Sequence, residues 1–172
     1  MPNDGRRYEI HDGELYVTPA PSVRHQLILS NLVRALMRHV PSVAPGLLLF
    51  APLDVILSDR PDETTIVRPD CLYIAPERMA LTSRRGMEGG PTLAIEILSP
   101  STRTIDRVTK RRLYARYAVP HFWLIDPDAR AVEAFVLAND RYVLAAAAAG
   151  AEPVDLPPFI GLALVPDALW AS

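Results

Sequence analysis

The sequence predicts an α/β (α+β) fold in which a central mixed β-sheet is flanked by two main helices. Two segments, 22–40 and 102–118, have the length and apolar spacing of amphipathic helices. Short apolar runs bounded by proline, glycine and polar residues lie before, between and after them, as expected for strands. Strands mixed with two sizeable helices favour layers packed around one sheet. The length of 172 residues fits one domain covering 1–172.

A β-hairpin begins the predicted fold. Strands Tyr8–Ile10 and Glu14–Thr18 flank His11-Asp12-Gly13, and Asp-Gly is a strong signal for a tight hairpin turn. Pro19 and Pro21 then end the second strand.

The first helix is expected from Ser22, whose hydroxyl can cap its N-terminus, to about Val40. One stripe along it follows the spacing i, i+4, i+7 and i+11: His25, Leu29, Leu32 and Leu36. This stripe is expected to face the sheet.

The second helix is expected after the break at Ser99-Pro100-Ser101. It ends near Ala118, because Val119 precedes a proline and is pushed out of the helical region. The remaining strands are predicted at 47–57 (one or two, broken at Pro52), 70–74, 93–98, 121–126, 131–137 and 141–144. Segments 59–63 and 76–90 are expected to be loops, and the proline-rich tail is expected to hold one short turn at 167–170.

Composition and charge exclude several classes of protein. Hydrophobic residues make up 49% and charged residues 22%, and no segment approaches the roughly 18 apolar residues of a membrane span. The polar start shows no secretory leader, and Cys71 is the single cysteine, so we expect a cytoplasmic protein without disulfides. The net charge of −2 argues against coating nucleic acid by bulk electrostatics. Six basic residues against one acid in 101–118 still permit a local basic patch, although a charged helix face is usually only solvated.

Two carboxylates stand where charge is expensive. Glu96 interrupts the apolar run Leu93–Leu98, and an unpaired buried charge costs several kcal/mol. Either a partner arginine neutralises it, or the strand is less buried than its sequence suggests, or Glu96 binds a cation or performs acid–base chemistry. Asp70 opens the preceding predicted strand, 70–74. The simpler interpretation is that it is only an aspartate at a loop-to-strand junction after Pro69. Carboxylates at strand positions are also the oxygen ligands that Mg²⁺ prefers.

Lys110 is the one lysine among 18 basic residues. Helical spacing places it with Asp106 and Tyr114 on the face expected to pack against the sheet. It can form an ordinary i, i+4 pair with Asp106, and it can also stabilise an anion or position a water beside the acidic strands; the two roles are not exclusive.

These residues carry a resemblance to a known family. Pro69-Asp70, Glu96 near the end of an apolar strand and a lysine resemble the PD-(D/E)XK nuclease superfamily. In detail the chain resembles the Uma-type family of restriction endonucleases over about residues 8–165. The further motifs occur in the family's order: Asp-Gly-Glu-Leu (12–15), Arg-His-Gln (24–26), Pro-Leu-Asp-Val (52–55), Leu-Ser-Pro-Ser (98–101), a tyrosine-rich helix and His-Phe-Trp-Leu-Ile-Asp-Pro (121–127).

The resemblance implies a restriction-endonuclease-like core and a Mg²⁺-dependent DNA endonuclease, with Mn²⁺ as a substitute metal and no small-molecule cofactor. Leu98 stands where the superfamily's strand lysine would be, which implies that Lys110 on the neighbouring helix replaces it. Asp70, Glu96 and the carbonyl of Ile97 would hold the metal. Lys110 would orient the attacking water or steady the phosphate.

Two further residues match family positions near the site. Glu14 could equally be a solvated strand charge, and His25 a hydrogen-bonded core residue. A homodimer is implied by analogy, since cutting both strands favours two sites.

Two other interpretations stay open. The chain could be a catalytically silent nuclease-fold module that binds nucleic acid or a protein partner, which would be favoured if Lys110 pointed away from Asp70 and Glu96. These three residues could also form a purely structural buried ion-pair network.

Overall fold

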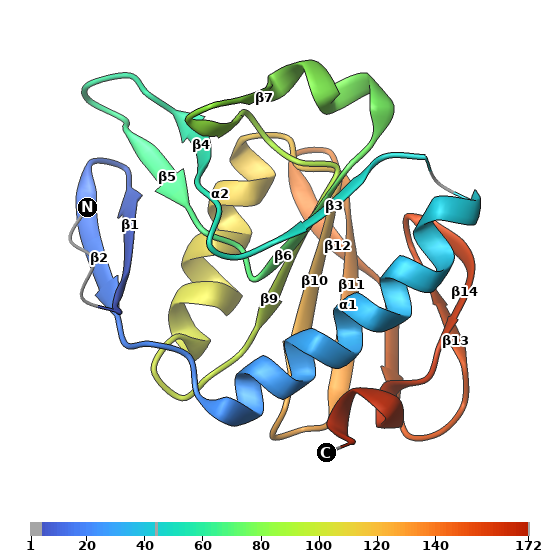
Figure 1. Cartoon of the computed structure of the whole chain (residues 1–172). Helices are drawn as coiled ribbons and strands as arrows, with labels where there is room; N and C mark the ends of the chain where they lie inside the picture. Colours follow the sequence, from blue (N-terminus) through green and yellow to red (C-terminus); the bar gives the residue numbers. More distant parts are fainter. Residues whose placement is uncertain (1–4, 44, 172) are drawn as a thin grey trace.

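The computed structural model describes residues 5–43 and 45–171, and its centre is a mixed β-sheet (Figure 1). The strand order is β12-β11-β10-β9-β6-β3. β9 and β10 run parallel, whereas the other neighbours are antiparallel. The strand bounds are β3 Leu47–Phe50, β6 Cys71–Ile74, β9 Leu93–Ile97, β10 His121–Asp126, β11 Ala131–Ala138 and β12 Arg141–Ala149.

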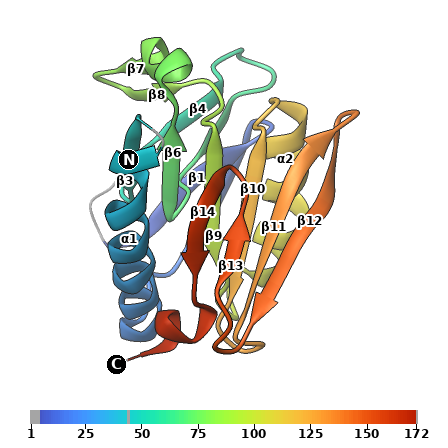
Figure 2. The same ribbon diagram turned by 90° about the vertical axis from the view of Figure 1, so that its right-hand side faces the viewer.

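Helices cover the two faces of this sheet. α1 (Val23–Val43) packs on one face, where Leu32 and Leu36 share a core with Trp123. The second helical segment, residues 103–116, packs on the other face. There Tyr114 shares a core with Phe122. Figure 2 shows α1 and α2 (Arg111–Arg116) on opposite sides of the strands. The predicted α+β class, a mixed sheet between two helices, is confirmed.

The start of α1 also agrees with its prediction. The Ser22 hydroxyl accepts a hydrogen bond from the His25 backbone N–H at 3.2 Å, which is N-terminal capping. The predicted stripe is buried along its whole length: His25, Leu29, Leu32 and Leu36.

The second helix differs from the single α-helix predicted. Residues Ile105–Lys110 form a π-helix, η2, which α2 continues. π-Helical turns widen a helix by one residue per turn and occur frequently at functional sites. Within η2, Asp106 and Lys110 are the buried residues, so the predicted inward face is retained.

A second sheet, with order β2-β1-β5-β4-β8-β7, lies beside α2. Val55, Val67 and Met87 from this sheet share a core with Leu113 and Tyr114 of α2. This packing holds the second sheet, which includes β1, next to the central sheet. The hairpin prediction is confirmed, with left-handed φ values of 51° at Asp12 and 84° at Gly13 in the turn. The strand bounds are β1 Arg7–His11, β2 Glu14–Thr18, β4 Val55–Ser58, β5 Thr65–Val67, β7 Thr82–Ser83 and β8 Gly86–Glu88.

Two segments hold more regular structure than the sequence predicts. The expected loop at 76–90 contains the 3-10 helix η1 (Pro76–Leu81) as well as β7 and β8. The tail forms a hairpin of β13 (Val154–Leu156) and β14 (Phe159–Leu164), followed by the 3-10 helix η3 (Pro166–Trp170). The Trp123 indole N–H donates to the Pro157 carbonyl at 2.7 Å, which ties this hairpin to the sheet.

Within residues 5–43 and 45–171, neither α1 nor any shorter helix has the length and apolar character needed to cross a membrane.

Asp126 anchors the second helical segment to the end of β10. Its carboxylate accepts hydrogen bonds from both terminal nitrogens of Arg103, at 2.8 and 3.1 Å, and from Arg107 at 3.0 Å. Burial alone would raise the pKa of Asp126, but the Arg103 hydrogen bonds, the backbone N–H of Ala129, Arg107 and the backbone N–H of Asp128 lower it to about 2. Arg103 and Arg107 therefore hold the fold together and are not free surface cations.

We predict that Asp126→Asn lowers the free energy of unfolding at pH 7 by about 1–2 kcal/mol, allowing for solvent screening. Because the folded pKa lies below the ordinary 3.8, this stabilisation is present above about pH 4 and is lost as pH falls toward 2. Urea unfolding of both proteins at several pH values measures the difference, which should shrink toward zero in acid. A difference that stays constant from pH 7 to pH 2 would contradict this role.

Candidate active site

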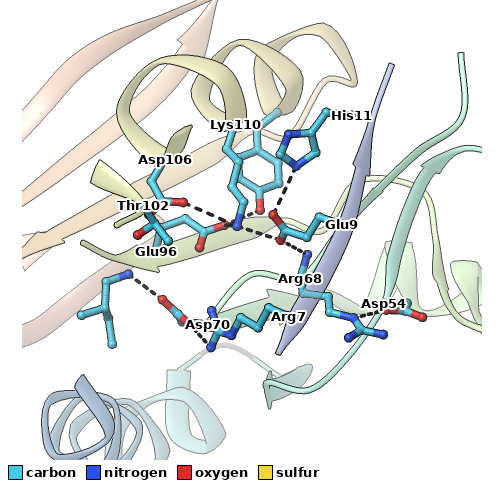
Figure 3. Close-up of polar contacts among 12 residues, drawn as sticks. Arg7, Glu9, His11, Asp54, Arg68, Asp70, Glu96, Thr102, Asp106 and Lys110 are labelled. Atoms are coloured by element: carbon cyan, nitrogen blue, oxygen red, sulfur yellow. Dashed lines mark hydrogen bonds and ion pairs between the residues drawn. The ribbon is translucent and has the colours of Figure 1, made fainter. Parts of the chain in front are cut away.

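Four buried carboxylates gather where the second helical segment meets β1 of the second sheet and β9 of the central sheet (Figure 3). We call this set the acidic cluster: Glu9, Asp70, Glu96 and Asp106, which are 5%, 1%, 1% and 3% exposed. A cavity of about 230 Å³ lies beside it, lined by members of the cluster together with Arg7, His25, Ile97, Lys110 and the segment 99–102.

Lys110 lies between three members of the acidic cluster. Its Nζ is 2.8 Å from Glu9 Oε1 and 3.0 Å from Glu96 Oε1. Asp106 Oδ1 lies 3.5 Å away on the same helix. The ammonium group is 4% exposed, so these contacts form in a low-dielectric interior where they are stronger than at the surface.

Glu96 is held through one of its oxygens. Tyr114 donates its hydroxyl to Glu96 Oε1 at 2.6 Å, and Lys110 donates to the same oxygen. The basic partner of this strand glutamate is therefore Lys110, where the sequence suggested an arginine. Both donors reach the same oxygen, Oε1, which fixes the orientation of the carboxylate.

Asp70 lies opposite Glu96 on the neighbouring strand. β6 and β9 pair Cys71 with Ile95, and one step further along this antiparallel register places Asp70 across from Glu96. Asp70 Oδ2 accepts a hydrogen bond from the Ile97 backbone N–H at 2.8 Å and contacts His25 Nε2 at 3.1 Å. β-Sheet pairing thus fixes the position of this carboxylate.

Arg7 supplies the second permanent cation. Its Nη2 lies 2.6 Å from Asp70 Oδ1. Burial would raise the pKa of Asp70, but His25, Arg7 and the Ile97 N–H lower it to about 2. Asp70 is accordingly ionised at neutral pH.

Glu9 is a member of the cluster that sequence reasoning missed. It accepts a hydrogen bond from the Arg68 backbone N–H at 2.6 Å and contacts His11 Nε2 at 3.2 Å. Burial raises its pKa, but the charge of Lys110, His11 and the Arg68 N–H outweigh this and lower the pKa to about 2. The sequence gives no signal for this burial, because a glutamate that alternates with the apolar Tyr8 and Ile10 is typical of the solvent-facing side of a strand.

The cluster holds more acid than base. Four carboxylates face two permanent cations, Lys110 and Arg7. Burial, together with the neighbouring carboxylates, raises the pKa of Glu96 well above its ordinary value, against the opposing effect of Lys110. Burial likewise raises the pKa of Asp106. The electrostatics of this site therefore favour an additional positive charge.

The donor atoms fit a hard divalent cation. Carboxylate and carbonyl oxygens are the ligands that Mg²⁺ prefers. Asp70 Oδ1 is buried and accepts no well-oriented hydrogen bond within the described residues, which leaves Arg7 as its partner. Over residues 5–43 and 45–171, no three or more His, Cys, Asp or Glu side chains are arranged as a preformed metal cage. A metal would therefore share or replace positions that Lys110 and Arg7 now occupy.

The structure brings most of the predicted site residues to one place. These are Asp70, Glu96, Ile97, Lys110 and His25.

Glu14 is the exception among the predicted site residues. It is exposed on β2 and accepts a hydrogen bond from Tyr16 at 3.3 Å. Its cross-strand partner is His11, which lies two residues nearer the turn than Glu9. The expectation that Glu14 lies near the site is therefore corrected: Glu9 takes that place.

A mixed sheet between two helices, with acidic residues near the strand ends and a lysine on the adjoining helix, defines a restriction-endonuclease-like core. The chain belongs to the Uma2 family, described as "Putative restriction endonuclease", whose model matches residues 1–168. A solved structure described as "a putative nuclease belonging to DUF820 from Anabaena variabilis ATCC 29413" is similar, with a TM-score of 0.72 at 23% sequence identity. The similarity covers 99% of this chain and 93% of that chain, and at this identity it shows the shared fold. No curated protein matches the sequence.

We predict that Lys110→Met lowers the free energy of unfolding by about 3–5 kcal/mol, because Glu9, Glu96 and Asp106 lose their buried cation. Urea unfolding at pH 7 measures the loss. Arg112→Met on the exposed side of α2 is the matched control and should change stability by about 0.5 kcal/mol or less. Equal effects of the two substitutions would show that Lys110 does not neutralise the cluster.

Proposed function

We propose that this protein is a Mg²⁺-dependent endonuclease that hydrolyses DNA phosphodiester bonds. The observation that carries the proposal is the convergence of Asp70, Glu96 and Lys110 at one site: Asp70 and Lys110 line the cavity, and Glu96 contacts Lys110 directly beside it. Membership of the nuclease family supports the reaction class.

Asp70, Glu96 and the carbonyl of Ile97 are the residues that would hold the metal, with Mn²⁺ as a substitute. When bound, a divalent cation neutralises phosphate charge and lowers the pKa of a coordinated water. The Ile97 N–H and His25 hold Asp70 at the cavity, and the Tyr114 hydroxyl holds Glu96 in place through Oε1. These contacts supply the second layer of hydrogen bonds that metal ligands require.

Lys110 would orient the attacking water or stabilise the charge that develops on the phosphate. Its side chain points toward Glu96 and lines the cavity, which is the orientation that this role needs. Glu9 and Asp106 keep the ammonium group charged: burial lowers the pKa of Lys110, but the carboxylates around it raise the pKa well above its ordinary value. Lys110 would therefore act as a fixed positive charge rather than as a general base.

DNA as the substrate is supported by a basic groove on the outer side of the second helical segment. This groove of about 890 Å³, between α2 and β12, is lined by Arg111, Arg112, Arg116 and Arg141 together with Asp140, and by Arg107, which is already paired with Asp126. Arginine guanidinium groups suit phosphate recognition. We propose a homodimer by analogy, because cutting both strands of a duplex favours two sites.

Two features of the chain accompany this proposal. We propose that residues 1–172 form one domain. In support, Val67 of the second sheet shares a hydrophobic core with Leu72 and Phe122 of the central sheet. We expect the protein in a reducing cytoplasm, since Cys71 is buried and forms no disulfide.

The alternative is a catalytically silent nuclease-fold module that binds nucleic acid or a protein partner. It is favoured by the ion pairs that Lys110 and Arg7 already make with the carboxylates, because a structural network would have the same contacts. It is disfavoured by the direction of the Lys110 side chain, which points into the site.

Cleavage of supercoiled plasmid in Mg²⁺ tests the proposal. We expect Glu96→Gln to reduce the rate by about 100-fold or more, because a ligand that places charge at the reacting phosphate is lost. Glu14→Gln is the matched control and should retain the wild-type rate, because Glu14 is exposed on β2. Equal rates for wild type and Glu96→Gln would contradict the assigned role.

Calorimetric titration with Mn²⁺ tests the ligand set without cleavage. The double variant Asp70→Asn/Glu96→Gln should lose binding by about 100-fold or more relative to wild type. Thermal unfolding of the double variant shows whether its fold is retained. Unchanged binding in a folded double variant would place the metal elsewhere, and no binding by wild type even with DNA present would favour the silent module.

A further inference from the structure

Arg7 occupies the oxygen of Asp70 that a metal would use. Of the two carboxylate oxygens, Oδ2 is held by the Ile97 N–H at 2.8 Å and by His25 at 3.1 Å. Oδ1 accepts no well-oriented hydrogen bond within the described residues, and Arg7 Nη2 lies 2.6 Å from it. Oδ1 is therefore the oxygen open to a cation, and a guanidinium group stands there.

Arg7 is held less firmly than the other cation of the site. Its side chain is 19% exposed, whereas Lys110 is 4% exposed and contacts three carboxylates. Arg7 is the first residue of β1 and pairs with Thr18 at the open end of the hairpin. Its side chain can leave Asp70 without disrupting the ladder that places Glu9 in the cluster.

The cavity wall offers Arg7 another partner. Arg7 lines the cavity together with Lys110 and the hydroxyl-bearing residues Ser99, Ser101 and Thr102. The lining also holds the carboxylates of Glu9, Asp70 and Asp106, so it would suit phosphate oxygens once a divalent cation offsets this negative charge. The planar fork of a guanidinium group binds phosphate through two parallel hydrogen bonds, which is a stronger contact than a single neutral one.

We propose that Arg7 is a metal-dependent phosphate contact. In the metal-free protein it neutralises Asp70. With a divalent cation held by Asp70, charge repulsion would free the Arg7 guanidinium group from this carboxylate, and Arg7 would then bind a phosphate of the nucleic-acid substrate in the cavity. This inference rests on the proposed metal-dependent nuclease function and adds to it a substrate-positioning residue on β1.

A purely structural Arg7 would behave in the opposite way. If Arg7 served only to orient Asp70, its removal would weaken metal binding and leave DNA affinity unchanged once metal is bound. If Arg7 competes with the metal, its removal strengthens metal binding, because the competing charge is lost. The sign of the change in metal affinity therefore separates the two roles.

Mn²⁺ titration of the DNA-free protein by calorimetry is the first measurement. Arg7→Gln should lower the Mn²⁺ dissociation constant by about threefold or more, through the loss of one competing charge. The matched control is Arg6→Gln, which removes the same charge from an exposed neighbouring residue and should leave the constant within about twofold. A dissociation constant that is unchanged or raised in Arg7→Gln overturns the inference and leaves the metal site intact. If wild type binds no Mn²⁺ without DNA, the titration is repeated with DNA present, and no binding there overturns both the inference and the proposed function.

Binding of a fluorescein-labelled DNA duplex in Ca²⁺ is the second measurement. Arg7→Gln should weaken DNA affinity by about tenfold, the effect of one lost charge-assisted contact, whereas Arg6→Gln should weaken it far less. If Arg7→Gln does not fold, Arg7→Lys is used, because it keeps the charge but cannot form the bidentate contact. Weaker DNA binding by Arg7→Lys supports the inference, and wild-type affinity overturns it.

Discussion

The contact between Lys110 and the carboxylates of Glu9 and Glu96 is the interaction on which the site depends. It joins three parts of the chain that are far apart in sequence: β1, β9 and η2. Each carboxylate would be costly to bury alone, and the shared ammonium group offsets that cost for all of them. Removing the lysine would leave the second sheet and the central sheet with like charges facing each other across their junction.

Ordinary secondary structure delivers these groups to one point. Parallel β9 and β10 lie at the middle of the central sheet, and the pairing of β6 with β9 places Asp70 across from Glu96. The π-helix η2 directs Asp106 and Lys110 inward, while Asp126 anchors the same segment through Arg103. The carboxylates are therefore preorganised by hydrogen bonds from the backbone and from Tyr114, as a metal site requires.

The sequence predicted the parts of the site whose chemistry conflicts with their surroundings. Glu96 in an apolar strand and Lys110 on an inward helical face were identifiable because burying charge is expensive. Glu9 was not identifiable in this way, because a glutamate in a short hairpin strand is normally solvated and its burial arises from the packing of the second sheet against α2. The pairing of Arg7 with Asp70 depends on that same tertiary contact.

The same distinction applies to the fold. α1 was predictable from its cap at Ser22 and its apolar stripe. The C-terminal hairpin was not predictable, because its strands are short and the prolines between them indicate a loop. That hairpin gains its stability from Phe159, which packs edge-on against Tyr73 and Trp123, contacts that no local pattern encodes.

The most direct test of the central claim, that the acidic cluster holds a divalent cation, is an anomalous difference map from crystals grown with Mn²⁺. A peak bounded by Asp70, Glu96 and the Ile97 carbonyl, with Arg7 displaced from Asp70 Oδ1, is the expected result. A map with no peak at this position, and with the Arg7 and Lys110 ion pairs unchanged at saturating Mn²⁺, would contradict it.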